Sequence, residues 1–275
     1  MKGCIRREVS GGEGTFNLKI FMQEKIYFKN KEGLKLCGVL SNPTGDKNRP
    51  IIILCHGFST GKDSSTNIAL EKTLGEKGVS TFRFDFFGHK ESEGNFEEIN
   101  VSKAVEDILC AIDFLKELGY QKIGLEGSSF GGFSAIIATS KSRDLFVLAL
   151  KCPVVDYYET ELKIRGEKGM ENWREDGYVR YNNGDGSFSR VNYSFVEDFS
   201  NNNALEAGKR IEIPTLIIIG DNDEFITIDH VQKLSSVVQD CKLEILPDAN
   251  HHFSKPDDFQ KIIEDITEFI LKHCN

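Results

Sequence analysis

Ser129 lies at the centre of the stretch Gly127-Ser128-Ser129-Phe130-Gly131, which fits the pattern G-x-S-x-G. An apolar run, residues 123–125, precedes the stretch, and small or apolar residues at helical spacing follow it. This order predicts a strand, a sharp turn and a helix, with a serine nucleophile at the tip of the turn. So tight a turn requires small neighbours, which Gly127 and Gly131 provide. The helix start favours the negative charge that develops during acyl transfer.

Two later loops supply the other groups that such chemistry requires. A serine hydroxyl is a weak nucleophile, so it needs a base within hydrogen-bond reach and a carboxylate that fixes the tautomer of that base. Asp221 and Asp223 follow one apolar run, and His251 and His252 follow the next. The chain order Ser, Asp, His matches one known arrangement of the triad. Either aspartate and either histidine fits, and Asp156 is a further candidate for the acid.

Each of these signals has a plainer interpretation. The pentapeptide alone also fits a serine- and glycine-rich helix start or a phosphate-binding turn. An aspartate after a strand is often only a turn former. His56 is interpreted as structural, because it precedes Gly57-Phe58 and would shape that turn. Metal binding by His251 and His252 is disfavoured because adjacent side chains point apart, so we expect neither a metal nor an organic cofactor.

Composition and charge narrow the class of protein. The 275 residues carry a formal charge of −9, which argues against nucleic acid or an anionic membrane surface as a partner and favours a small-molecule substrate. Neither a signal peptide nor a run of about eighteen apolar residues occurs. Seven cysteines, an odd number without C-x-x-C, are expected to be reduced thiols. These features predict a cytoplasmic enzyme, and a homodimer stays an open alternative.

The rest of the chain supplies the elements that position these residues. Two alternating runs, 25–29 and 34–40, predict a β-hairpin. After it, predicted strands (51–55, 79–84, 123–125, 145–152, 214–219, 243–246) alternate with predicted helices (68–77, 101–115, 133–138, 229–238, 259–270). This alternation predicts one α/β domain over 1–275 with a mostly parallel sheet flanked by helices. Loops at the carboxyl ends of parallel strands converge, which would bring the candidate residues together.

Two segments depart from this alternation. Residues 1–24 carry few signals and are expected to form a lead-in or a short edge element. From about residue 154 to 208, after the sixth strand, apolar periodicity fades and a hairpin about the turn 183–186 is expected. A stretch of this length is interpreted as a lid insertion over the edge of the sheet.

Several motifs together resemble those of the α/β-hydrolase superfamily, and more narrowly its serine esterases of the cinnamoyl and feruloyl esterase type. They are HGF at 56–58, DFFGHKESEGNF at 85–96, GSSFGG at 127–132, GDNDEFI at 220–226 and ANHHF at 249–253. The resemblance runs from about residue 25 to the C-terminus, apart from the insertion. It implies the α/β-hydrolase fold with a lid.

The resemblance also implies roles for single residues. Ser129 matches the nucleophile of the family, Asp223 its acid and His251 its base. The family's oxyanion hole uses two backbone N–H groups, which fall here on Phe58 and Phe130. A serine at position 129 differs from the cysteine of dienelactone hydrolases and from the aspartate of haloalkane dehalogenases. Lys90 stands where the more common D-x-x-G-x-G-x-S has a glycine, which affects the loop but no catalytic position.

The insertion is rich in aromatic residues, and Trp173, Tyr178 and Tyr181 are candidates for substrate contact. Rings of a lid would stack on a phenolic acyl group. The alternative is that these rings form the lid's own small core.

The sequence therefore predicts a serine carboxylic-ester hydrolase that acts on a small ester with a cinnamoyl- or feruloyl-like aromatic group. One alternative keeps the machinery and changes the substrate, giving a thioesterase or an acyl-aminoacyl hydrolase or other peptidase. A single domain without a propeller-sized extension disfavours a prolyl-oligopeptidase-like role. A non-catalytic hydrolase-like binding protein is the remaining alternative.

Overall fold

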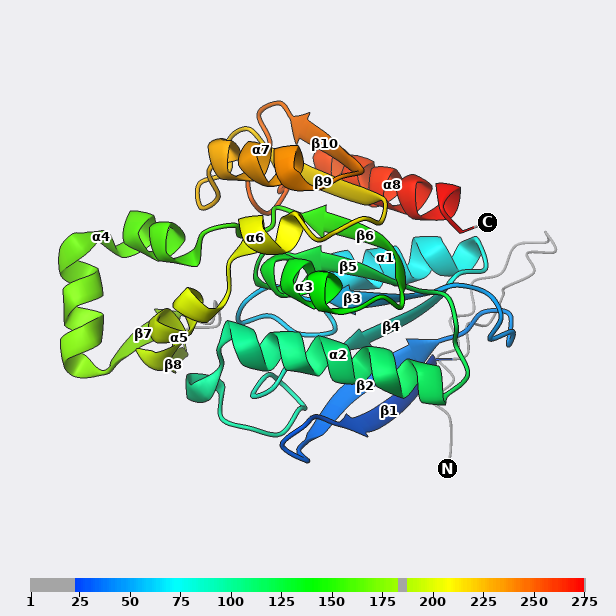
Figure 1. Ribbon diagram of the computed structural model, residues 1–275, viewed down its shortest axis with the longest axis horizontal. Coiled ribbons are helices and arrows are strands. Elements are labelled where there is room, and N and C mark those ends of the chain that lie inside the picture. The colour runs from blue at the N-terminus through cyan, green and yellow to red at the C-terminus, as the bar shows by residue number, and fades with distance from the viewer. Residues whose placement is uncertain (1–22, 183–186, 275) are drawn as a thin grey trace, which may run out of the picture.

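An eight-stranded sheet runs through the molecule in the computed structural model, which describes residues 23–182 and 187–274 (Figure 1). The strand order is β1-β2-β4-β3-β5-β6-β9-β10. The strands are β1 (Gln23–Lys29), β2 (Lys35–Ser41), β3 (Ile51–Cys55), β4 (Ser80–Phe84), β5 (Ile123–Ser128), β6 (Leu145–Lys151), β9 (Thr215–Gly220) and β10 (Cys241–Leu246). Within this sheet, as far as the structure describes it, only the β1–β2 and β2–β4 pairs are antiparallel, so the predicted mostly parallel sheet is confirmed.

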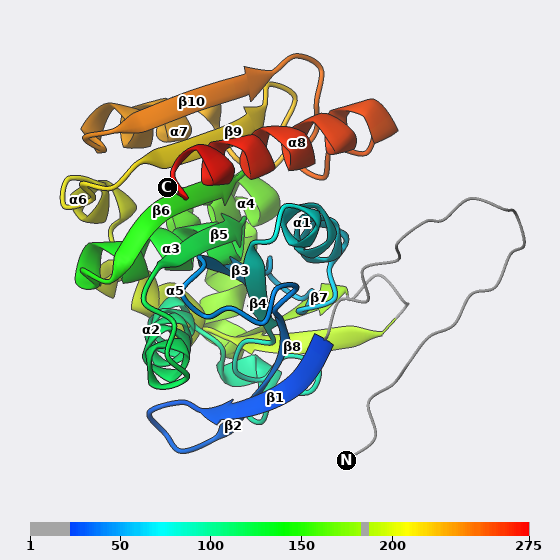
Figure 2. The ribbon, with the colours of Figure 1, turned by 90° about the vertical axis from the view of Figure 1, so that its right-hand side faces the viewer.

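Helices cover both faces of the sheet. The pair α1 (Ser65–Glu76) and α8 (Pro256–Lys272) lies on one face, and α2 (Val101–Glu117), α3 (Phe130–Lys141), α6 (Ala204–Gly208) and α7 (Ile228–Val237) lie on the other (Figure 2). A short 3-10 helix, η1 (Phe96–Glu98), precedes α2. Because both faces are covered, the central strands are apolar along their whole length, as in the fully buried run of β3. The predicted hairpin and the α/β alternation are therefore found in the structure.

Residues 154–214, in the chain between β6 and β9, contribute no strand to this sheet within the described ranges (Figure 1). We call them the β6–β9 segment. It contains α4 (Tyr157–Asp176), β7 (Tyr178–Asn182), β8 (Phe188–Asn192), α5 (Ser194–Asp198), η2 (Phe199–Asn201) and α6. The strands β7 and β8 form the expected antiparallel pair. Its predicted turn, 183–186, lies outside the described residues, as does most of the predicted lead-in at 1–24.

Helix α4 was not predicted from the sequence. Few of its side chains are buried, namely Tyr157, Thr160, Glu161, Met170 and Trp173, so the apolar stripe that reveals a helix is weak. In addition, Gly166 has φ 68° and ψ 170°, which interrupts the helix and shifts the helical period. The sequence pattern therefore did not reveal α4, because most of its side chains are exposed and the chain is kinked at Gly166.

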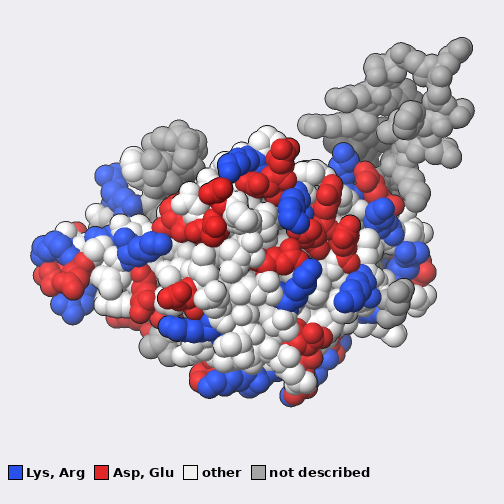
Figure 3. Space-filling model, turned by 90° about the horizontal axis from the view of Figure 1, so that it is seen from above, with Lys and Arg blue, Asp and Glu red and all other residues white. Residues whose placement is uncertain are grey.

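The structure also shows how charged side chains, apolar helices and thiols are distributed over the described residues. Acidic and basic side chains are interspersed on the face seen in Figure 3, which offers no continuous basic surface. No helix within the described ranges has the length and apolarity needed to cross a membrane. The described cysteines, residues 37, 55, 110, 152, 241 and 274, are all free thiols.

Candidate active site

Ser129 lies at the junction of β5 and α3, in a conformation that side chains rarely adopt. Its φ is 53° and its ψ is −111°, and α3 begins at the next residue, Phe130. The backbone N–H of Ser129 donates to the carbonyl oxygen of Lys151 at 2.9 Å, which fixes the turn against β6. A non-glycine residue at positive φ persists only where its surroundings require it. The predicted strand, turn and helix place the hydroxyl at the carboxyl edge of the sheet.

The two glycines around Ser129 are required by close backbone contacts. A Cβ on Gly131 would lie 2.3 Å from the carbonyl oxygen of Cys55, and a Cβ on Gly127 would lie 2.6 Å from the carbonyl oxygen of Gly131. Neither neighbour is a flexible side chain, so neither can move aside cheaply. The G-x-S-x-G pattern is therefore a consequence of packing the turn between β3 and β5.

The structure brings Ser129, His251 and Asp223 together. The Nε2 atom of His251 lies 3.2 Å from the Oγ atom of Ser129, and its Nδ1 atom lies 2.7 Å from Oδ2 of Asp223. These residues follow the strands β5, β10 and β9, whose carboxyl ends share one edge of the sheet. His251 is buried, whereas Ser129 is partly exposed. The geometry is that of a hydroxyl, an imidazole and a carboxylate in line for proton transfer.

Asp223 is held in its charged form by its surroundings. Burial by itself raises the pKa of this carboxyl, but the hydrogen bond from His251 lowers it. The backbone N–H groups of Phe225 and Ile226 also donate to its Oδ1 atom, at 2.9 and 2.8 Å. The net result is a pKa below the usual value. A carboxylate in this position orients the imidazole and stabilises the imidazolium that forms during reaction.

The residues that the sequence left as alternatives have other contacts. The Oδ1 atom of Asp221 accepts from the backbone N–H of Asp248 at 2.6 Å. Asp156 caps helix α4 and accepts from the N–H of Glu159 at 2.9 Å. His252 is exposed, whereas the neighbouring His251 is buried. The tertiary structure thus brings Asp223, and not Asp221 or Asp156, to the imidazole.

Phe58 lies on the loop after β3, and Phe130, the residue after the serine, begins α3. As the first residue of α3, Phe130 has a backbone N–H without a partner one turn earlier. The rings of Phe58 and Phe130 pack edge to face with centroids 5.5 Å apart. A Cβ on Gly57, the residue before Phe58, would lie 3.6 Å from the Cβ of Ser129, so this loop passes directly beside the hydroxyl. Both predicted oxyanion donors therefore belong to backbone next to the nucleophile.

His56 has the structural role that its position suggests. Its Nε2 atom accepts from the backbone N–H of Phe86 at 3.1 Å, so the proton is on Nδ1, which donates to the carbonyl of Gly57 at 2.8 Å. Burial lowers the pKa of His56 to about 4, which keeps the ring neutral. This ring connects the loop after β3 to the loop after β4 and shapes the backbone that leads to Phe58.

A second link between these loops was missed in the sequence. Lys62 donates its backbone N–H and its ammonium group to the two oxygens of Asp85, each at 2.7 Å, and both side chains are buried. No local pattern shows this pair, because its members are 23 residues apart.

Lys90, which replaces the family's glycine, has φ 42°, so the backbone keeps the left-handed conformation that a glycine would adopt easily.

The three predicted substrate-contacting rings lie in different environments. Trp173 is 1% exposed, and its Nε1–H donates to the carbonyl of Val191 at 3.0 Å. Tyr178 lies under Arg190, whose guanidinium carbon is 4.4 Å from the ring centroid. Tyr181 packs on Phe58 with ring centroids 4.9 Å apart. Enclosure of Trp173 favours a role in the core of the β6–β9 segment, and Tyr181 is the ring that contacts the Phe58 loop.

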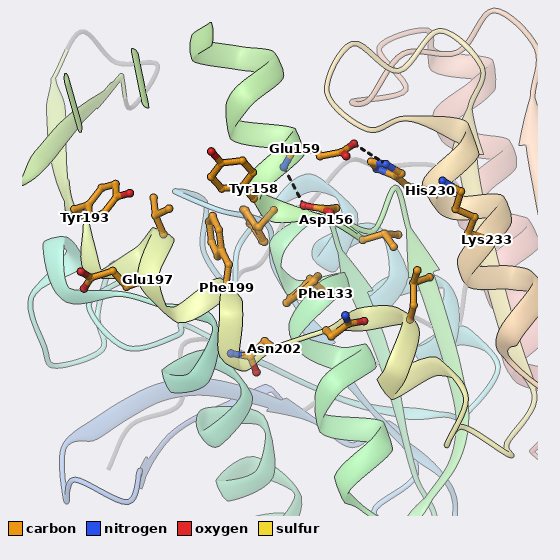
Figure 4. A pocket seen from close by; sticks show the side chains of 15 residues that line it. Phe133, Asp156, Tyr158, Glu159, Tyr193, Glu197, Phe199, Asn202, His230 and Lys233 are labelled. Carbon is orange, nitrogen blue, oxygen red and sulfur yellow. Dashed lines mark hydrogen bonds and ion pairs between the residues drawn. The ribbon is translucent and has the colours of Figure 1, made fainter. Parts of the chain in front are cut away.

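A pocket of about 750 Å³ lies between the β6–β9 segment and α7 (Figure 4). Aromatic and polar side chains line it, including Phe133, Tyr158, Phe199 and Lys233. A contact between Oε2 of Glu159 and Nε2 of His230, 2.9 Å apart, joins its two sides. Ser129, His251 and the three predicted aromatic residues do not line this pocket, so it is a neighbouring cavity and not the space around the hydroxyl.

The donor atoms that come closest to forming a metal site near the serine are already engaged. Cys152, Asp223 and His251 have ligand atoms within 4.8 Å of one another. However, Asp223 and His251 hydrogen-bond to each other, and burial raises the pKa of the Cys152 thiol, which keeps it protonated. Since a metal requires the thiolate, this group fits a proton-transfer site better than a metal site.

The chain is similar in sequence to a known protein family and to curated proteins. A family model described as the prolyl oligopeptidase family matches residues 71–275, which include Ser129, Asp223 and His251. A curated relative from Bos taurus, palmitoyl-protein thioesterase ABHD10, mitochondrial, is 27% identical over 240 residues, which cover 81% of this chain and 74% of that protein. Thiohydrolase aneE of Aspergillus aculeatus is 32% identical over 142 residues, which cover 49% of this chain and 44% of the relative. This chain thus matches less than half the length of aneE.

Solved structures share the fold. Est1E from Butyrivibrio proteoclasticus, in a structure with ferulic acid bound, superposes with a TM-score of 0.79 at 24% identity, covering 90% of this chain and 98% of that chain. At this level of identity the likeness shows a common α/β-hydrolase fold. The predicted α/β-hydrolase fold is therefore confirmed, and the lid insertion stays a prediction.

Proposed function

Because the chain belongs to the prolyl oligopeptidase family, a hydrolase family of the α/β-hydrolase superfamily, we propose that it is a serine carboxylic-ester hydrolase. The observation that carries the proposal is the alignment of the Ser129 hydroxyl, the His251 imidazole and the Asp223 carboxylate, at 3.2 and 2.7 Å. A substrate with a small, cinnamoyl- or feruloyl-like acyl group is the finer part of the proposal. It is supported by the aromatic residues around Phe58.

In the proposed first half-reaction, His251 Nε2 accepts the proton of the Ser129 hydroxyl while the Oγ atom attacks the ester carbonyl. The backbone N–H groups of Phe58 and Phe130 hold the oxyanion of the tetrahedral intermediate. The intermediate collapses to an acyl-serine, and the departing alkoxide takes the proton from the imidazolium. Asp223 stabilises the imidazolium throughout.

In the second half-reaction, water replaces the alcohol. His251 accepts a proton from this water, whose oxygen attacks the acyl carbonyl. The second tetrahedral intermediate expels the Ser129 oxygen, which regains its proton from the imidazolium, and the carboxylic acid leaves. The site returns to its starting state, and no metal or organic cofactor takes part in the proposed cycle.

The first test is the Ser129→Ala variant, assayed with p-nitrophenyl acetate and p-nitrophenyl butyrate. We expect kcat to fall by about 10⁴-fold or more, because the nucleophile is removed. Ser140→Ala is the matched control, since its hydroxyl donates to the Ile137 carbonyl on the same helix and should leave kcat unchanged. Turnover by the Ser129→Ala variant at the wild-type rate would exclude this mechanism.

A thioesterase is the second candidate, and the names of the two curated relatives favour it. The same acylation and hydrolysis would proceed from a thioester, with a thiol as the leaving group. A panel of aryl esters that includes methyl ferulate, of acyl thioesters, and of aminoacyl anilides for the peptidase alternative separates these activities by kcat/KM. A preference for thioesters of more than about tenfold over esters of the same acyl group would replace the first proposal with the second.

A further inference from the structure

Strand β6 lies between the strand that leads to the serine and the strand that leads to the acid, in the order β5-β6-β9. Its last residue, Lys151, pairs with Ser128 of β5 on one side and with Ile218 of β9 on the other. Lys151 therefore lies between the strand that ends before Ser129 and the strand that ends before Asp223. Its side chain is nonetheless a lysine, and it is only 6% exposed.

Lys151 contacts the backbone of both the nucleophile and the base. Its carbonyl oxygen accepts from the N–H of Ser129 at 2.9 Å, and its Nζ atom donates to the carbonyl oxygen of His251 at 3.2 Å. The ammonium also lies over the ring of Phe253, 5.2 Å from the centroid, on the same loop as the histidine. One residue thus joins the turn that holds the hydroxyl to the loop that holds the imidazole.

We propose that Lys151 is a positioning residue for the proposed acyl transfer, in that it sets the distance between the Ser129 hydroxyl and the His251 imidazole. The inference rests on the proposed function. Lys151 does not touch the reacting atoms, because its contacts are with the backbone of Ser129 and His251 and with the ring of Phe253. Its effect is on the 3.2 Å separation of Nε2 and Oγ, the distance over which the proton must move.

Stability alone does not account for a lysine here. No carboxylate among the described residues forms an ion pair with the Lys151 ammonium. The buried carboxyl whose pKa its charge lowers is Glu126 of β5, which accepts from the Ser128 hydroxyl at 3.0 Å. Its second oxygen, Oε2, has no hydrogen-bond partner in the described structure. Burial raises the pKa of Glu126 to about 7, although the Ser128 hydroxyl and the Lys151 charge oppose this shift. Apolar side chains in place of such buried titratable groups often leave stability unchanged or increase it.

Cys152, the residue after Lys151, lies close to Asp223, the candidate acid. Cys152 has φ 43°, and its Sγ atom lies within 4.8 Å of both the Asp223 carboxylate and a ring nitrogen of His251. Its backbone N–H donates to the carbonyl of Ile218 on β9 at 2.8 Å. The end of β6 therefore contacts all three candidate catalytic residues within two positions of the chain.

The test separates positioning from stability with three variants. Lys151→Met removes the ammonium but keeps a long apolar side chain, and we expect kcat for p-nitrophenyl butyrate to fall about 10- to 100-fold with KM changed less than about twofold. Lys151→Arg, which keeps a donor, should retain more of kcat. The double variant Lys151→Met with Glu126→Leu removes both buried titratable groups, so the melting temperature should recover while kcat stays low.

One control variant and one labelling experiment make the result decisive. Lys116→Met removes an exposed lysine whose ammonium pairs with Asp144 at the far end of α2, and it should leave kcat unchanged. Recovery of kcat along with the melting temperature in the double variant would overturn the proposal, as would wild-type kcat in Lys151→Met. Failure of the proposed function looks different, because then a fluorophosphonate would not label Ser129 in the wild-type protein and Ser129→Ala would keep its activity.

Discussion

The Asp223→Asn variant tests the proposed proton transfer at a single atom. The Oδ1 atom of Asp223 accepts from the backbone N–H groups of Phe225 and Ile226, and Oδ2 faces Nδ1 of His251 at 2.7 Å. In asparagine, the amide oxygen keeps the two backbone bonds, so the amide nitrogen takes the place of Oδ2. That nitrogen donates to Nδ1, which forces the imidazole proton onto Nε2. The imidazole then cannot accept the proton of Ser129.

The expected size of the effect follows from this change of tautomer. The substitution keeps the volume and the backbone contacts but disables the base, and in serine proteases the same change lowers kcat by about 10⁴-fold. A loss of this size corresponds to about 5 kcal/mol in the activation free energy. The assay is the steady-state kcat for p-nitrophenyl butyrate near neutral pH, with the melting temperature as the check on folding.

Asp221→Asn is the matched control for this experiment. Asp221 lies two residues away on the same loop, and its Oδ1 atom accepts from the backbone of Asp248. An asparagine oxygen can accept the same bond, so we expect kcat within about twofold of wild type, a change of about 0.4 kcal/mol. The reasoning is refuted if Asp223→Asn keeps kcat within tenfold of wild type, or if Asp221→Asn loses as much as Asp223→Asn.

Two further predictions concern the β6–β9 segment and the pH dependence of stability. Trp173→Phe removes the hydrogen bond to the Val191 carbonyl and should lower the free energy of unfolding by about 1 kcal/mol without changing kcat, as denaturant unfolding and ester assays will show. A selective rise in KM would instead assign Trp173 to substrate contact. Burial raises the pKa of Asp107 to about 7, so its stabilising contribution is complete below the unfolded pKa near 4 and is lost as the pH rises through 7. Asparagine has no carboxyl to ionise, so as the pH rises from about 4 to 7 the free energy of unfolding of Asp107→Asn should increasingly exceed that of wild type, by at most about 4 kcal/mol. Equal profiles of melting temperature against pH for the two proteins would contradict this.

Local sequence was enough for the elements that bury a regular apolar pattern. The run at 51–55 forms β3 with the same bounds, and the amphipathic helix expected from residue 101 begins there. Helix α4 escaped because its exposed surface and the kink at Gly166 leave little periodicity to detect. The periodicity of apolar residues in a sequence reflects which side chains are buried, so an element with few buried side chains is poorly predicted.

For the candidate site, the sequence by itself determined the turn that carries Ser129, because the two glycines and the flanking apolar runs are neighbours along the chain. Only the tertiary structure decided between Asp221 and Asp223, and it also showed the contact of Lys151 with the His251 carbonyl, 100 residues away. The physical reason is that a hydrogen bond depends on distance and direction in space. Residues on separate loops acquire both only when the parallel strands bring their carboxyl ends to one edge of the sheet.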